Sequence, residues 1–73
     1  MYTAVIIDDE RKAREALEKI IERYFSDHYV VVASAESVAL GVDAIKKYNP
    51  DIVFLYIEMP NENGFELFKY FPN

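Results

Sequence analysis

The stretch VIIDDE, residues 5–10, sets the fold, because an apolar β-branched run stops abruptly at three acidic residues. The apolar run spans Thr3 to Ile7, a length typical of a β-strand. It does not alternate with polar residues, so it predicts a strand buried on both faces, as in a parallel sheet. Asp8 and Asp9 then fall at the carboxyl end of that strand.

The residues that follow show the spacing of an amphipathic helix. Apolar side chains recur at intervals of three and four, which places them on one helical stripe. The members of this stripe are Ala13, Ala16, Leu17, Ile20, Ile21 and Tyr24. A second apolar run at residues 29–33 predicts a second strand.

The second half of the chain continues the alternation of predicted strands and helices. Ser37 is a suitable cap for a helix that continues to about Tyr48, where Asn49 and Pro50 end it. Residues 52–57, IVFLYI, predict the third and most apolar strand. Turn-forming residues at 60–64 predict a loop, and residues 65–71 predict the start of a third helix.

Strands that alternate with helices predict an α/β fold with parallel pairing and right-handed crossovers. The order is β-α-β-α-β followed by a third helix, which is about half of a doubly wound sheet. We therefore expect residues 1–73 to form a single partial domain.

Composition excludes several functions. The 73 residues carry a formal charge of -5, which argues against binding of nucleic acid by this segment. The chain has no cysteine and one histidine, His28, so neither a disulfide nor a thiolate or imidazole zinc site is expected. The sequence shows no membrane-spanning run and no secretion signal, so a cytoplasmic location is expected and no membrane contact.

The adjacent carboxylates of Asp8 and Asp9 have two interpretations. Ligands of open α/β sheets bind beyond the carboxyl ends of strands, and paired carboxylates there suit a hard cation such as Mg²⁺. Alternatively, the acidic residues only favour the positive end of the helix that follows. Taken alone, the pair favours the second interpretation.

Three segments together resemble a known family. They are VIIDDE at 5–10, PDIVFLYIEMP at 50–60 and NGFEL at 63–67, and the resemblance covers essentially the whole chain. In order and spacing they resemble the receiver domains of bacterial two-component response regulators, most closely those that carry a LytTR-type DNA-binding domain. The resemblance implies a flavodoxin-like sheet, of which this chain has the strand order 2-1-3, and a histidine kinase as partner.

The resemblance also implies a site. Asp8 and Asp9 match the acidic pair that holds Mg²⁺, and Glu58 matches the position whose backbone carbonyl completes the metal site. Tyr56 stands where the family has its phosphate-accepting aspartate. A phenol loses its proton only near about pH 10, so it is a weak nucleophile and a poor metal ligand at neutral pH. We therefore expect Mg²⁺ to bind weakly if it binds, and Tyr56 to pack by its ring.

The resemblance leads to a functional expectation. The later strands, with the family's hydroxyl residue and lysine, are not in this sequence, so the third strand is expected to have an open edge. We expect a receiver module that is not an enzyme, cannot be phosphorylated, and acts through protein contacts or as a homodimer through the third strand or the C-terminal helix. Glu58 as a substitute acceptor is disfavoured by its position. The remaining alternative is a structural half-domain that dimerises and has no signalling role, or a fragment of a longer regulator.

Overall fold

The computed structural model describes residues 1–59 and 62–71. The predicted β-α-β-α-β order is confirmed, and the predicted loop at 60–64 lies partly outside the described residues. The elements are β1 (Tyr2–Ile7), α1 (Arg11–Tyr24), β2 (Tyr29–Ala35), α2 (Val38–Tyr48), β3 (Ile52–Leu55), β4 (Glu58–Met59), β5 (Glu62–Asn63) and the 3₁₀-helix η1 (Gly64–Lys69).

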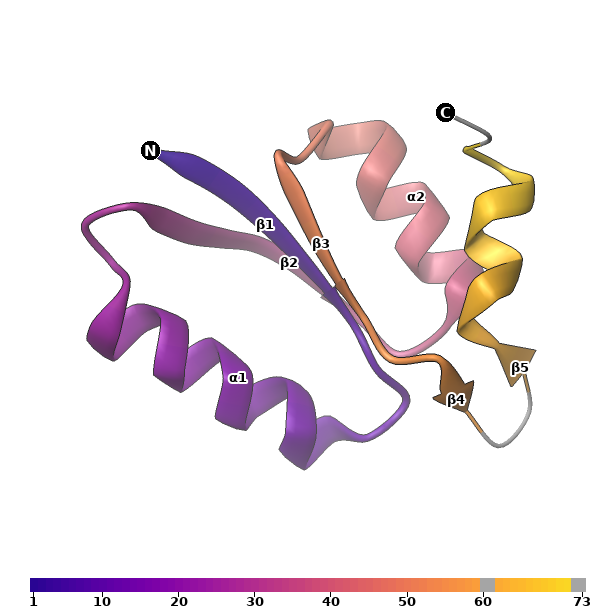
Figure 1. The fold of residues 1–73 in the computed structure, drawn as a ribbon, viewed down its shortest axis with the longest axis horizontal. Coiled ribbons are helices and arrows are strands. Elements are labelled where there is room, and N and C mark those ends of the chain that lie inside the picture. Colours follow the sequence, from indigo (N-terminus) through magenta and orange to yellow (C-terminus); the bar gives the residue numbers. More distant parts are fainter. Residues whose placement is uncertain (60–61, 72–73) are drawn as a thin grey trace.

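The main sheet is parallel and has the order β2-β1-β3, as predicted. Helix α1 lies on one side of this sheet, and α2 with η1 lies on the other, so the described residues form three layers (Figure 1). A parallel sheet needs cover on both faces, which explains why its central strand is continuously apolar. None of the helices in the described part of the chain has the length and apolarity needed to cross a bilayer.

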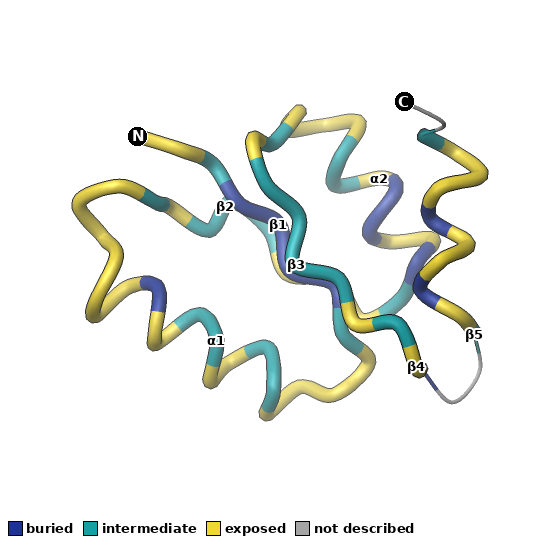
Figure 2. The backbone as a smooth tube through the Cα atoms, viewed as in Figure 1, coloured by how far each residue is buried: buried dark blue, intermediate teal, exposed yellow. Residues whose placement is uncertain are grey.

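Strand β1 is the centre of the core. Ala4, Val5, Ile6 and Ile7 are each at most 1% exposed, and Figure 2 shows this burial concentrated where β1 runs between its neighbours. Towards α2 and η1, one cluster of buried residues closes the core. Its members are Val5, Ile7, Ala35, Val38, Val42, Met59 and Leu67.

Helix α1 is covered less completely than its apolar stripe predicts. Only Ile21 is buried on this helix, whereas Ile20 is 47% and Tyr24 68% exposed. The apolar stripe of α1 is wider than the sheet surface on which it packs, since the main sheet of the described residues contains only β1, β2 and β3. The sequence pattern alone does not show how much of a helical stripe finds a partner.

The third strand is shorter than predicted. Strand β3 ends at Leu55, not at residue 57, and the chain then forms a small antiparallel pair in which Glu58 faces Asn63 and Met59 faces Glu62. Gly64 follows this pair and packs directly on the backbone of the strand end. A Cβ atom there would collide with the carbonyl oxygen of Tyr56 and lie 2.9 Å from the Cα of Ile57.

The predicted third helix begins as the 3₁₀-helix η1. The side chain of Asn63 caps it by accepting a hydrogen bond from the backbone N–H of Phe65 at 2.8 Å. Leu67 is buried at 5% exposure and joins the core, whereas Phe65 and Phe68 are 60% and 55% exposed. Leu67 therefore attaches η1 to the core, whereas Phe65 and Phe68 leave much of their surface exposed.

Replacing Leu67 by alanine tests how firmly η1 is attached to the core. We expect Leu67→Ala to lower the free energy of unfolding by about 2–4 kcal/mol, because it leaves a cavity among buried residues. The matched control Phe68→Ala removes a more exposed side chain and should cost about 1 kcal/mol or less. Urea unfolding followed by circular dichroism measures both, and equal losses would show that η1 is not packed as described.

Candidate functional site

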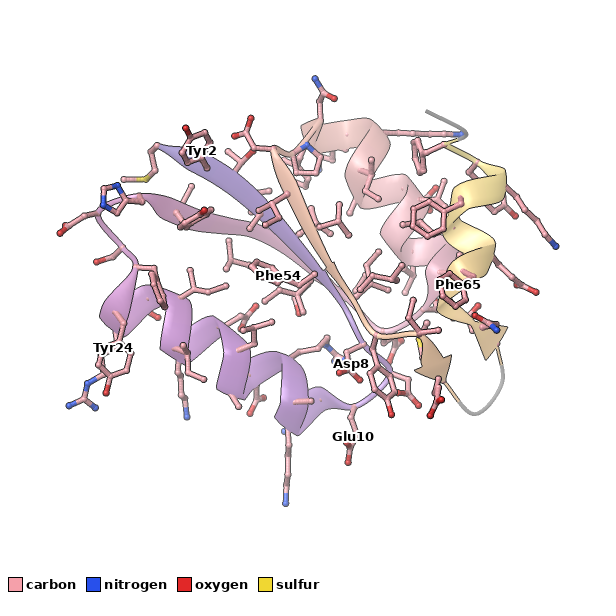
Figure 3. The ribbon with its side chains drawn as sticks, viewed as in Figure 1. Tyr2, Asp8, Glu10, Tyr24, Phe54 and Phe65 are labelled. Carbon is pink, nitrogen blue, oxygen red and sulfur yellow. The ribbon has the colours of Figure 1, made fainter. Side chains whose placement is uncertain are left out.

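The candidate site lies at the carboxyl edge of the parallel sheet. Ile7 and Leu55 are paired at the ends of β1 and β3, so Asp8 and Tyr56 follow on adjacent strands. Two backbone hydrogen bonds hold this edge: Tyr56 N–H donates to Ile7 O at 2.9 Å, and Asp8 N–H donates to Ala35 O at 3.0 Å. Figure 3 shows Asp8 at this edge, where the chain leaves β1 towards Glu10 and α1.

Asp8 is engaged in the turn that starts α1. Its carboxylate Oδ1 accepts a hydrogen bond from the backbone N–H of Glu10 at 2.9 Å, which is the geometry of an Asx-turn. Its carbonyl oxygen accepts a hydrogen bond from Nη1 of Arg14 at 2.8 Å. The side chain therefore has a structural use that requires no bound ion.

Tyr56 occupies the position where the resemblance places the phosphate acceptor. It is 47% exposed and lines a groove of about 250 Å³ between α1 and the sheet. Leu17 and Phe54 line the same groove, and Asp8 lies at its end. Tyr56 thus contributes to a groove lined largely by apolar side chains.

Asp9, the second residue of the acidic pair, borders a different hollow from Asp8. Asp9 lines a small pocket with Glu36, Ser37, Met59 and Glu62. Glu58, in β4, is exposed. Asp8 therefore borders the groove of Tyr56, while Asp9 borders the pocket beside α2.

Glu62 is a residue that sequence reasoning missed. Its Oε1 accepts a hydrogen bond from the backbone N–H of Val38 at 2.6 Å, at the start of α2. Ser37 caps the same helix by accepting from Leu40 N–H at 3.2 Å, as the sequence predicts. Glu62 and Val38 are 24 positions apart in the sequence, so no local sequence motif predicts this hydrogen bond.

The donor set does not fit the metal that the resemblance implies. Within residues 1–59 and 62–71, no group of three or more His, Cys, Asp or Glu side chains is placed to hold a metal ion. Tyr56, where the resemblance places a third carboxylate, offers a phenol, and Asp8 Oδ1 accepts a hydrogen bond from Glu10 N–H. Two separate carboxylates and a carbonyl leave a Mg²⁺ ion dependent on water for most of its coordination.

Comparisons with known proteins show the family to which this chain is similar. Residues 4–73 match the response regulator receiver domain family. An uncharacterized response regulatory protein of Vibrio parahaemolyticus is 42% identical over 67 residues, which cover 92% of this chain and 27% of that protein. The sensory transduction protein LytT of Bacillus anthracis is 34% identical over 67 residues, covering 92% of this chain and 26% of LytT.

A solved structure shows the same fold. The response regulator domain of Thermotoga maritima CheB superimposes with a TM-score of 0.84 and 30% sequence identity, over 96% of this chain and 51% of the CheB chain. The chain belongs to the response regulator receiver domain family. It spans about a quarter of the length of the curated relatives and about half of the CheB domain. The resemblance stated from sequence, including the flavodoxin-like fold, is confirmed.

The substitution Tyr56→Asp tests whether the phenol is what weakens metal binding. A carboxylate at this position would add an oxygen ligand next to Asp8 and Asp9, so we expect the affinity for Mg²⁺ to rise by roughly tenfold or more. The matched control Tyr56→Asn removes the ring without adding charge and should change the affinity little. Amide chemical shifts of residues 8, 9 and 56, followed during Mg²⁺ titration, report both. Equal Mg²⁺ affinities of the two variants would show that the residue at position 56 does not limit Mg²⁺ binding.

Proposed function

We propose that this chain is a receiver module that does not accept a phosphoryl group and acts through protein contacts. One observation supports the proposal: Tyr56 follows β3 at the carboxyl edge of the sheet, with its N–H bonded to Ile7 O, at the position where the sequence resemblance puts the family's acceptor. The module is not an enzyme in its own right under this proposal.

The chemistry of aspartyl phosphorylation explains why Tyr56 matters. The acceptor carboxylate acts as the nucleophile, and a dication offsets the charge of the incoming phosphoryl group. A neutral phenol supplies neither the nucleophile nor a ligand that holds the dication. The substitution therefore removes two requirements of the reaction at one position.

Glu58 does not take over the role of the acceptor in this proposal. It lies two positions beyond Tyr56, in β4, where its backbone pairs with Asn63. That antiparallel pair directs the chain away from the parallel sheet, and the Glu58 side chain is exposed. A carboxylate in this place is not aligned beside Asp8 at the end of β1.

The surface of the module offers apolar contacts in place of phosphate chemistry. Phe65 and Phe68 are exposed on η1 with ring centroids 6.3 Å apart, and β3 pairs only with β1 among the described residues. Exposed aromatic groups are typical of protein interaction surfaces. The partners we propose are a histidine kinase, as for receiver domains in general, and a second copy of the chain.

Incubation with a small phosphodonor and Mg²⁺, followed by intact-mass analysis, tests the loss of phosphorylation. We expect no phosphoryl adduct on this chain, under conditions in which a complete receiver domain with an acceptor aspartate is labelled. An adduct that forms only with Mg²⁺ would contradict the proposal. Its persistence or loss in Glu58→Gln would then show whether Glu58 is the acceptor.

A structural half-domain that dimerises without a signalling role is the second candidate, and the exposed aromatic side chains Phe65 and Phe68 favour it. Binding to the cognate histidine kinase separates the two candidates. We expect the signalling module to bind the kinase's phosphohistidine-bearing domain in calorimetry, and to compete there with a complete receiver. A chain that self-associates but shows no such binding would support the structural candidate.

A further inference from the structure

The dipeptide Asn63–Gly64 connects β5 to η1, and the fold has a use for each of its two residues. Asn63 caps η1, because its Oδ1 accepts a hydrogen bond from Phe65 N–H at 2.8 Å. Gly64 is buried, and a Cβ atom at this position would collide with the carbonyl oxygen of Tyr56. Packing therefore requires a glycine directly after the asparagine cap.

An asparagine followed by glycine is prone to spontaneous deamidation, because glycine has no side chain to shield its backbone nitrogen. The nitrogen of Gly64 attacks the side-chain carbonyl carbon of Asn63, and the new C–N bond closes a cyclic imide, the succinimide. The bond to the side-chain amide breaks, and ammonia leaves with the proton of the attacking N–H. Water then opens the succinimide at either carbonyl, which gives an aspartate or an isoaspartate at position 63.

The folded conformation of this dipeptide does not permit the attack. Ring closure requires the Cα–Cβ bond of Asn63 to be nearly eclipsed with the peptide C–N bond to Gly64. Asn63 instead has φ -101° and ψ 125°, an extended conformation that holds the two bonds well apart. The Gly64 N–H also donates a hydrogen bond to Ile57 O at 2.8 Å. The attacking nitrogen is therefore engaged elsewhere as long as the fold is closed.

Contacts with distant parts of the chain hold this segment closed. Glu62, the residue before Asn63, accepts a hydrogen bond at Oε1 from Val38 N–H at 2.6 Å, which ties β5 to the start of α2. On the other side of the dipeptide, Leu67 is buried in the core, so η1 lies beside α2 (Figure 1). Only a local opening that breaks these contacts frees the nitrogen of Gly64.

We propose that the Asn63–Gly64 dipeptide is a self-modification site that the fold protects, and that it deamidates only when the segment from β4 to η1 opens. The reaction needs water alone, so it depends neither on phosphorylation nor on a partner. Its rate therefore measures how often this segment leaves its place beside α2.

Each product changes the contacts of the strand pair β4–β5. Asn63 faces Glu58 in this pair, so an aspartate at position 63 would set two carboxylates opposite each other, although it would still cap η1. An isoaspartate adds a methylene to the backbone, which shifts the register of the pair and displaces Gly64 from the strand end. Deamidation therefore hinders the return of the opened segment to its original packing.

Deamidation rates of the folded and the unfolded chain test the protection. The chain is incubated in mildly alkaline buffer with or without denaturing guanidinium chloride, and mass-spectrometric peptide mapping measures both products at position 63. We expect the folded chain to react at least roughly tenfold more slowly, since only its small open population reacts. Asn49 is the internal control, because the nitrogen of Pro50 carries no hydrogen and cannot form the succinimide.

The substitution Glu62→Ala tests which contact keeps the segment closed. It removes the acceptor of Val38 N–H, so the rate in the folded chain should rise by roughly tenfold. The matched control Glu66→Ala removes an exposed carboxylate of η1 and should change the rate little. Each rate is divided by the rate of the same unfolded variant, so that effects of the neighbouring sequence on the chemistry cancel. If Glu62→Ala does not fold, the unaltered chain in guanidinium chloride below its unfolding transition gives the same test, because local opening should already accelerate the reaction there.

The substitution Asn63→Asp reproduces one product of the reaction. We expect it to raise the equilibrium constant of unfolding by up to about fivefold, because the new carboxylate faces Glu58. Glu58→Gln in the same chain should remove most of this increase. An increase that persists in the double variant would contradict the proposed effect of the product.

The outcomes for the site itself are distinct. Slow deamidation of the folded chain, together with acceleration in Glu62→Ala but not in Glu66→Ala, supports the proposal. Equal rates in the folded and the unfolded chain overturn it, as does an Asn63 that stays unmodified when the chain is unfolded. Equal acceleration in the two glutamate variants also overturns it, because the contact with α2 would then not control the opening.

Discussion

The parallel pairing of β1 with both of its neighbours is the constraint on which the rest of this structure depends. Ala4 to Ile7 are almost completely removed from water, and the registers of β2 and β3 are both defined against this one strand. Parallel pairing requires crossovers, which are right-handed, and the chain steps from β1 to β2 in one direction and from β2 to β3 in the other. This reversal places α1 and α2 on opposite faces of the sheet. Parallel pairing also brings every strand's carboxyl end to one edge, which is why Asp8 and Tyr56 lie on neighbouring strands.

Gly41 shows how tightly this centre is packed. A Cβ atom on Gly41 would overlap the side chain of Ile7, with 2.8 Å to its Cγ1. Glycine in the middle of α2 weakens helix propensity, but here it lets the helix approach the buried strand closely. The local cost is offset by the contact of α2 with the core.

The sequence predicts the elements that rest on local rules. The apolar runs give the three parallel strands, Ser37 caps α2 as expected, and α2 ends at Tyr48 as predicted. At the helix end, Asn49 takes the left-handed conformation, with φ 45° and ψ 59°, which asparagine tolerates better than most residues. These features depend on residues that are close in the sequence, so they can be predicted from the sequence alone.

Features that depend on distant contacts could not be predicted in the same way. The β4–β5 pair, the 3₁₀ geometry of η1 and the Glu62 contact with Val38 all arise where the chain after β3 packs on α2. The exposure of Ile20 and Tyr24 depends on how far the sheet extends, which no helical pattern encodes. Asp8 and Tyr56 follow the ends of adjacent strands, as the strand pattern of the sequence predicts, whereas their role as a site stays a prediction. The sequence did not predict that Asp8 borders the groove of Tyr56 while Asp9 borders the pocket beside α2.

Position 56 shows why a fold can keep its shape while its chemistry changes. The backbone of Tyr56 donates its N–H to Ile7 O, and its carbonyl oxygen lies where Gly64 leaves room for it. Both roles belong to the main chain, so they are the same for tyrosine and aspartate. The side chain lines a groove with Leu17 and Phe54 that accepts an aromatic ring, and Asp8 is held by the turn into α1. The backbone architecture of this edge therefore does not depend on the side chain at position 56, which here adds an aromatic ring to the groove between α1 and the sheet.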